Sequence, residues 1–348
     1  GLPCAPRNTP GWQEVLVLPA YREPATLAQQ LRQLPSGTGR TLVILVLNRP
    51  QSDPDPGANQ PLRRALTALP EQAEGPQVRV LNPSTDLYVH DMEANGATVP
   101  SAQGVGLARK TGCDIALQWM VDGAIAGDWI YSTDADAILP RDYFSKLDNS
   151  AGAVAAVFPF HHQPGHDPDC NRATALYELS LHYYVAGLEY AGSPYAYHSL
   201  GSCLAIRAQA YAQVRGFPKR SGGEDFYLLN KLAKLGAVRR LAGECIHLQA
   251  RYSQRVPFGT GPAVEKISKA GQPLQQPLFY HPQSFLALRA TLESVPLLAE
   301  LPTRDLHSLL CEQGLERSLA NSTARILTDM GLADALDHCR RQGLSLIH

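Results

Sequence analysis

Residues 128–140 read Asp-Trp-Ile-Tyr-Ser-Thr-Asp-Ala-Asp-Ala-Ile-Leu-Pro, an apolar run that ends in two carboxylates one residue apart. The pattern predicts a buried strand that stops before Pro140. Alternate side chains on a strand share a face, so Asp134 and Asp136 can point the same way beyond the strand, where open α/β sheets bind ligands. Two carboxylates there suit Mg²⁺ or Mn²⁺. A short acidic turn without a metal is the alternative on this spacing alone.

Apolar runs on the amino-terminal side of this stretch predict further strands. Glu14–Pro19 and Leu42–Leu47 are continuous apolar runs, as expected of strands covered on both faces, and Val78–Leu81 is a third candidate. Residues 82–103 are expected to be irregular. Helical spacing of apolar residues predicts three helices, at Thr26–Leu34, Leu62–Leu69 and Gly104–Trp119. Strands that alternate with helices imply a parallel sheet, and hence an α/β fold.

The region after the acidic stretch begins with another strand candidate, Ala151–Phe160, and then the polar segment His161–Asp167. Three histidines and an aspartate could hold a transition metal, but no fixed ligand spacing is present, which favours a mobile polar loop over the site. Ala173–Tyr190 is predicted to be a helix. Its tyrosines are expected to line the core and the cleft rather than to hold a cofactor.

A second informative segment is Ser221–Leu229, where glycines precede Glu224 and Asp225. Glycines allow a tight turn and a close approach of the backbone to a ligand. Asp225 to Leu235 is predicted to be an amphipathic helix, and acids at its start can alternatively do no more than complement the helix dipole. A further strand is expected to end at His247, as a metal ligand or as a packed ring.

Composition excludes several classes of protein. The 348 residues carry a formal net charge of -1, and the basic residues are scattered, so a nucleic-acid partner is not expected. The longest apolar run, at residues 151–160, is far shorter than the roughly 20 residues of a membrane-spanning helix, and no signal peptide is evident. Seven cysteines without a CxxC pair indicate reduced thiols. We therefore expect a cytoplasmic protein, with peripheral contact to a membrane left open.

Several short motifs, taken in chain order, resemble those of family 2 nucleotide-sugar glycosyltransferases with the GT-A fold. They are Val15–Glu23, Gly106–Gly112, Thr133–Asp136 (a DXD motif), Gly201-Ser202, Arg215–Pro218, Glu224-Asp225 and His247. The resemblance implies a Rossmann-like, mostly parallel sheet flanked by helices over residues 12–262. The donor half would be about 12–140 and the acceptor half 141–262. Residues 273–348 are expected to form a helical carboxyl-terminal region.

The resemblance also implies roles for individual residues. Asp134 would approach the ribose, Asp136 and His247 would bind the divalent metal, and Asp225 would be the catalytic base. Glu224 would position Asp225 or an acceptor hydroxyl. The remaining donor-binding residues would be Pro19, Tyr21 and Glu23 of the nucleotide pocket, Asn48 after the second strand, Arg109 near the base or diphosphate, and Gly201 and Ser202 beside the sugar. Asn48 stands where the family usually has acidic and small residues, which leaves the nucleotide open.

The segment after His247 is less typical. Residues 249–261 combine Arg251 and Arg255 with glycines, the composition of a loop that folds over phosphates, although an ordinary surface loop is the alternative. We place both arginines among the donor-binding candidates.

These residue types suit transfer of a sugar, as by a hexosyltransferase, from a nucleoside diphosphate to an acceptor hydroxyl. A metal would act as a Lewis acid on the diphosphate, and a single carboxylate opposite the leaving group predicts inversion with Asp225 as base. A retaining transferase and a non-catalytic or regulatory nucleotide-sugar binding module are the alternatives. A nucleotidyltransferase or dehydrogenase is disfavoured because Ala20–Glu23 lacks their glycine-rich loop. The acceptor, whether small molecule, glycan or lipid-linked glycan, is undetermined.

Overall fold

The computed structural model describes residues 2–6, 11–72, 75–148, 150–253, 259–270, 278–300, 305–332 and 334–336. The chain divides into two compact units, Gly1–Glu178 with Ser199–Pro273, and Leu179–His198 with Leu274–His348. The second unit therefore takes in residues 179–198 as well as the carboxyl-terminal region. Within the described ranges, none of the helices combines the length and the apolar character that crossing a bilayer requires.

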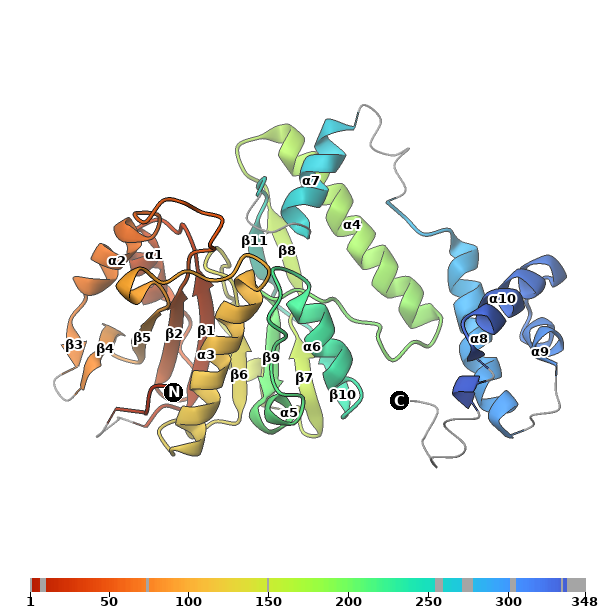
Figure 1. The fold of residues 1–348 in the computed structure, drawn as a ribbon, viewed down its shortest axis with the longest axis horizontal. Coiled ribbons are helices and arrows are strands. Elements are labelled where there is room, and N and C mark those ends of the chain that lie inside the picture. The colour runs from red at the N-terminus through yellow and green to blue at the C-terminus, as the bar shows by residue number, and fades with distance from the viewer. Residues whose placement is uncertain are drawn as a thin grey trace. The chain divides into compact units, whose positions relative to one another are not determined.

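The first unit is built on a sheet of nine strands in the order β10-β7-β9-β6-β1-β2-β5-β4-β3 (Figure 1). β1 runs parallel to β2 and β6, β2 to β5, and β7 to β10, whereas β9 is antiparallel to both of its neighbours. This large, mostly parallel sheet confirms the predicted α/β class. The strands are β1 (Glu14–Ala20), β2 (Thr41–Leu47), β3 (Glu71–Gln72), β4 (Gly75–Asn82), β5 (Thr85–Asp91), β6 (Trp129–Ser132), β7 (Ala153–Val157), β9 (Leu204–Arg207) and β10 (Ala237–Arg240).

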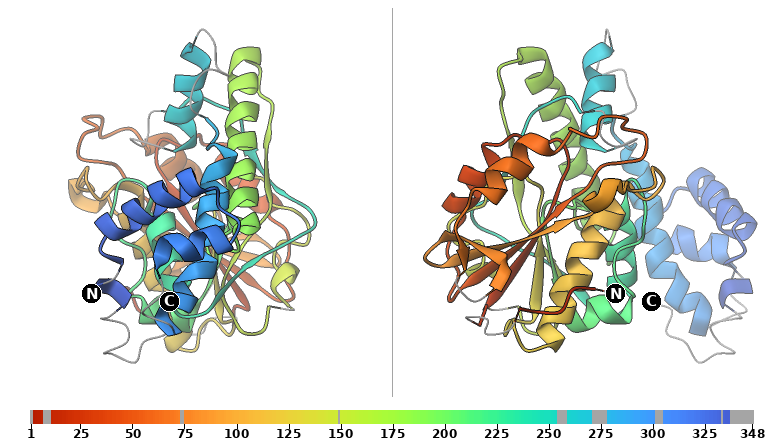
Figure 2. Two further views of the ribbon diagram at one scale, coloured as in Figure 1. Left: turned by 90° about the vertical axis from the view of Figure 1, so that its right-hand side faces the viewer. Right: turned by 60° about the vertical axis from the view of Figure 1, so that its left-hand side comes forward.

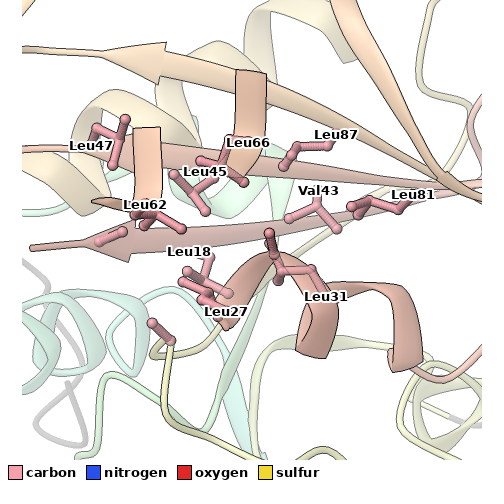
Figure 3. Close-up of a cluster of buried hydrophobic side chains, with 13 residues drawn as sticks. Leu18, Leu27, Leu31, Val43, Leu45, Leu47, Leu62, Leu66, Leu81 and Leu87 are labelled. Atoms are coloured by element: carbon pink, nitrogen blue, oxygen red, sulfur yellow. The ribbon is translucent and has the colours of Figure 1, made fainter. Parts of the chain in front are cut away.

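Helices cover both faces of the sheet. The leucines of α1 (Leu27–Gln30), of the 3₁₀ turn η1 (Leu31–Gln33) and of α2 (Gln60–Thr67) pack on the face that carries Leu18, Val43 and Leu45 (Figure 3). α3 (Gly104–Val121) packs on the opposite face, where a Cβ on Gly112 would lie 2.5 Å from Val17 and 2.9 Å from Val46. The remaining helices of this unit are α4 (Pro168–Tyr190, shared with the second unit), α5 (Ala208–Gln213), α6 (Glu224–Leu232) and α7 (Thr260–Lys269).

One expectation about the sheet is wrong. Residues 82–103 were expected to be irregular, but β5 lies within them and pairs with β2 over seven residues. The sequence of β5 does not look like a buried strand because it contains polar residues. One of them, Asp86, is fully buried and accepts hydrogen bonds from Trp12 Nε1 at 2.8 Å and from Arg40. A strand whose polar side chains are paired inside the protein does not show the apolar pattern of the other strands.

The segment His161–Asp167 also differs from the expectation of a polar loop. His161, His162 and Gln163 belong to β8 (Phe160–Gln163), which pairs in parallel with β11 (Ile246–Gln249) as a separate two-stranded sheet. His247 lies inside β11 rather than at a strand end, and its backbone pairs with Ile138.

The topology gathers several chain segments at one edge of the large sheet. The carboxyl ends of β1, β2 and β6 meet there because these strands are parallel. β9 runs the other way, with Leu204 opposite Ser132, so the residues that precede β9 reach the same edge. Gly106 of α3 donates its N–H to the Arg220 carbonyl at 2.9 Å, which holds the segment before α6 beside the start of α3. Figure 2 allows these elements to be followed from two further directions.

The described part of the second unit is helical. It contains α8 (Pro282–Glu300), α9 (Leu306–Glu312) and α10 (Arg317–Asp329). Ala290, Leu310, Leu315 and Ala320 form one of its buried clusters. The carboxyl-terminal part of α4 packs closely on α8, because a Cβ on Gly187 would lie 2.3 Å from the Phe285 ring.

Candidate functional site

A cleft of about 790 Å³ lies at the edge of the sheet where these segments converge. Its walls belong entirely to the first unit. The cleft brings together every predicted site residue except His247 and Arg255. These lining residues are Pro19, Tyr21, Glu23, Asn48, Arg109, Asp134, Asp136, Gly201, Ser202, Glu224, Asp225 and Arg251. Arg255 lies outside the described residues, as do 254–258 of the predicted phosphate loop.

A buried charge network forms the floor of the cleft. The Arg109 guanidinium, with 3% of the side chain exposed, donates Nε–H to Glu224 at 2.9 Å and also binds Asp134. A further bond runs from its Nη1 to the Ser132 hydroxyl at 2.9 Å. Burial alone would lower the pKa of Arg109, but the charges of Asp134, Glu224 and Asp225 raise it above its usual value. Arg109 is thus engaged by the protein's own carboxylates, and it orients them rather than extending freely toward a nucleotide.

Two glycines are required by this geometry. A Cβ on Gly201 would lie 2.6 Å from Arg109 Nη2 and 2.8 Å from its Cζ, so only glycine lets the segment before β9 lie against the guanidinium. Gly223, which caps α6, has φ +68°, a left-handed conformation that glycine adopts without strain. This turn brings Glu224 and Asp225 to the first turn of α6 at the floor of the cleft.

Asp225 has the chemistry of a base that works near neutral pH. Burial raises the pKa of its carboxyl, and the adjacent Glu224 charge raises it further, to about 7. Arg109 and the backbone N–H of Phe226, which donates to Asp225 Oδ1 at 2.7 Å, act in the opposite direction. A carboxylate with this pKa is ionised at slightly alkaline pH and still basic enough to accept a proton.

Asp136 has a different environment from Asp134, although both line the cleft. Its carboxylate binds the Arg251 guanidinium at 2.5 Å, and the two side chains are 25% and 36% exposed. The aspartate predicted to bind metal is therefore paired with the arginine predicted to bind phosphate. A partly solvated pair of this kind is held less tightly than a buried one and can exchange partners when stronger ligands enter the cleft.

His247, which is predicted to bind the divalent cation together with Asp136, does not line the cleft. Reciprocal backbone hydrogen bonds of 2.8 and 2.9 Å to Ile138 bring His247 beside the segment that carries Asp136. Within the described ranges its Nδ1 is buried without a hydrogen-bond partner, which is unusual for a polar atom inside a protein. No group of three or more His, Cys, Asp and Glu side chains able to hold a metal exists among the described residues. Asp136 and His247 thus fit a cation that takes its other ligands from a diphosphate and water.

The amino-terminal end of the cleft presents a hydrogen-bond acceptor from a nearly buried amide. Asn48 is 6% exposed, and its Nδ2 donates to the carbonyls of Ala20 at 3.1 Å and Val46 at 3.3 Å. Two carbonyl partners fix the orientation of this amide, whose oxygen accepts no hydrogen bond within the described residues. Tyr21 donates its hydroxyl to Asp53 at 2.7 Å, and this bond holds the ring at the cleft wall.

The cleft also contains residues that the sequence did not mark as binding residues. His162, Phe226 and Thr260 line it, from β8, α6 and α7 respectively, and Tyr177 of α4 is one of the tyrosines expected at the cleft. His162 was noticed only as part of a polar loop. The carboxylate that binds it, Glu178, is sixteen residues further along on α4, and no local motif connects the two.

Comparisons with known proteins give little further guidance. No protein-family profile and no curated protein sequence matches the chain. Among solved structures, a mannosyltransferase from Pyrobaculum calidifontis in complex with GDP-mannose and Mn²⁺ is similar, with 17% identity, a TM-score of 0.42, and coverage of 94% of this chain and 90% of that chain. A mycobacterial protein is 15% identical, with a TM-score of 0.38 over 85% of this chain and 76% of its own. Likenesses this distant do not decide the family or the activity.

Proposed function

We propose that this protein is a divalent-metal-dependent glycosyltransferase that moves a sugar from a nucleoside diphosphate to an acceptor hydroxyl with inversion. The observation that carries the proposal is the meeting of Asp225, whose pKa stands at about 7, with Asp134 and Asp136 in one cleft. The family 2 resemblance assigns the same residues to this chemistry. We assign the donor to the half of the first unit up to about residue 140, and the acceptor to the half that follows.

Asp225 performs the proton transfer in this proposal. As the acceptor oxygen bonds to the anomeric carbon, its proton passes to the Asp225 carboxylate. The bond between that carbon and the diphosphate oxygen breaks, and its electron pair leaves with the diphosphate. Burial beside Glu224 makes Asp225 basic enough for this step, and Arg109 holds the adjacent Glu224 carboxylate in position.

Donor binding uses the rest of the floor and the amino-terminal wall. Asp136 and His247 would hold a Mn²⁺ or Mg²⁺ ion, which supplies charge neutralisation to the departing diphosphate when bound. Arg251, released from Asp136, is free to bind a phosphate oxygen. Tyr21 and the amide oxygen of Asn48 meet the nucleoside.

The proposal is tested by binding and turnover in parallel. The melting temperature should rise with one of the UDP-, GDP-, ADP- or dTDP-sugars, and more so with Mn²⁺, because a ligand that binds only the folded state stabilises it. The same donor should be hydrolysed slowly without acceptor. If a donor binds but no nucleoside diphosphate is released, the protein is a nucleotide-sugar binding module and not a transferase. If none of the nucleotide sugars binds, the proposal is refuted.

A further inference from the structure

A histidine–carboxylate pair, His162 and Glu178, lies at the cleft, which His162 lines. His162 is 7% exposed, and its Nδ1 lies 2.6 Å from Glu178 Oε2. The backbone N–H of His162 donates to the same oxygen at 2.7 Å, and His161 Nδ1 lies 2.8 Å from Oε1. Although burial opposes ionisation of Glu178, these hydrogen bonds lower its pKa to about 2. Glu178 is therefore a carboxylate at every working pH.

The ionised carboxylate fixes the tautomer of the ring. Because Glu178 can only accept, His162 must donate from Nδ1, and the lone pair of the neutral ring is then on Nε2. Nε2 has no hydrogen bond within the described part of the chain, although the residue is more than nine-tenths buried and borders the cleft. The residue lines the cleft, so this acceptor is open to a hydrogen-bond donor on a ligand.

Other residues of the site favour a carbohydrate hydroxyl over a metal ion as the group that uses this lone pair. The metal candidates Asp136 and His247 already fit a cation that a diphosphate would complete. Phe226, next to the base Asp225, lines the cleft with 54% of its surface exposed. Such an aromatic face beside hydrogen-bonding groups suits a carbohydrate ring, whose C–H groups pack on the aromatic surface while its hydroxyls bind polar atoms.

We propose that His162, held by Glu178, accepts a hydrogen bond from a second hydroxyl of a carbohydrate acceptor that packs on Phe226. The reacting hydroxyl of this acceptor is the one at Asp225. The inference rests on the proposed transferase function and adds the class of acceptor. His162 is a positioning residue, because it takes no proton in the reaction.

The test uses the donor selected by the binding panel and the methyl glycosides of glucose, galactose and mannose as acceptors. At least one should raise nucleoside diphosphate release above the rate with water. Removing one of its non-reacting hydroxyls, in a set of monodeoxy analogues, should raise the acceptor KM by about threefold to tenfold, the size of one hydrogen bond. In His162→Phe this penalty should vanish, and in His162→Gln, whose amide oxygen can accept, it should return in part.

The matched control is His161→Phe, which binds the same Glu178 from an exposed position outside the cleft, with 58% of the side chain exposed. This variant should keep the full deoxy penalty. Donor binding and the Mn²⁺ dependence should match the parent in all three variants, so a failure of the donor assay itself would count against the transferase function and not against this subsite. Three results would overturn the inference: no methyl glycoside acts as acceptor, the penalty persists in His162→Phe, or His162→Phe loses Mn²⁺ binding.

Discussion

Asp134 and Asp136 are two residues apart in the chain, yet they bind arginines in different environments. The difference lies in their cationic partners, because the Asp134 side chain is itself 41% exposed and that of Asp136 25%. Asp134 binds Arg109, whose side chain is 3% exposed, whereas Asp136 binds Arg251, whose side chain is 36% exposed. A buried cation cannot leave its carboxylates without a large desolvation cost, but a half-exposed arginine can exchange its partner at a smaller cost. The first arrangement is suited to holding Asp225 in place. The second is suited to exchanging a protein cation for a metal and a phosphate.

The largest effect is expected at the base that the Arg109 network holds. Asp225→Asn keeps the shape of the side chain but cannot accept the proton, so turnover should fall by roughly 10²- to 10⁴-fold. The donor dissociation constant, measured by calorimetry, should be unchanged. Full activity of this variant would make Asp225 only a helix-start acid that complements the α6 dipole.

The buried network itself should be sensitive to removal of its cation. Arg109→Met leaves Glu224 buried without its partner, and the free energy of unfolding should fall by about 3–5 kcal/mol. The control is Arg172→Met, because the Arg172–Asp169 pair is exposed, at 70% and 73%, and should change stability by less than about 1 kcal/mol. Equal urea denaturation curves for the two variants would show that the buried Arg109 network stabilises the fold no more than the exposed Arg172–Asp169 pair does.

Loss of the Asp136–Arg251 pair should change ligand binding rather than the stability of the fold. Asp136→Ala should weaken Mn²⁺-dependent donor binding by at least about 10- to 100-fold, the range found when groups that support a bound metal are removed. Its urea midpoint should stay close to that of the parent. Asp169→Ala, at an exposed acid of the control pair, should change neither property. Calorimetry that shows parent-like Mn²⁺ and donor binding in Asp136→Ala would remove this residue from the metal site.

The smallest expected effect is a shift in the pH profile. Because burial and Glu224 raise the pKa of Asp225 to about 7, kcat should increase with pH through about 7 as the carboxylate loses its proton. Glu224→Gln removes one of the charges that raises this pKa, so the acid limb should move to lower pH. The folded state also holds this proton more tightly than the unfolded chain does. Its contribution to stability is therefore full below about pH 4, the unfolded pKa, and is lost as the pH rises toward 7. If the acid side of the kcat–pH profile does not move in Glu224→Gln, the group that titrates in this profile is not Asp225.

The parts of the molecule that sequence predicted are those with local signals. Apolar runs located β1, β2 and β6, and strand alternation placed Asp134 and Asp136 beyond the carboxyl end of β6. The family resemblance added Tyr21 and Asn48, which the structure brings to the same cleft. β5 was missed because Asp86 is paired with Trp12 and Arg40, which are distant in the sequence. The Arg109–Glu224 and His162–Glu178 pairs also join distant segments, so neither could be found by spacing.

The anomeric configuration of the product tests the central claim most directly. One displacement with Asp225 as base must invert the configuration of the transferred sugar, because the acceptor attacks from the face opposite the diphosphate. The coupling constant of the anomeric proton in the NMR spectrum of fresh product should therefore report the configuration opposite to that of the donor. Retained configuration would contradict the single displacement and the role of Asp225 together.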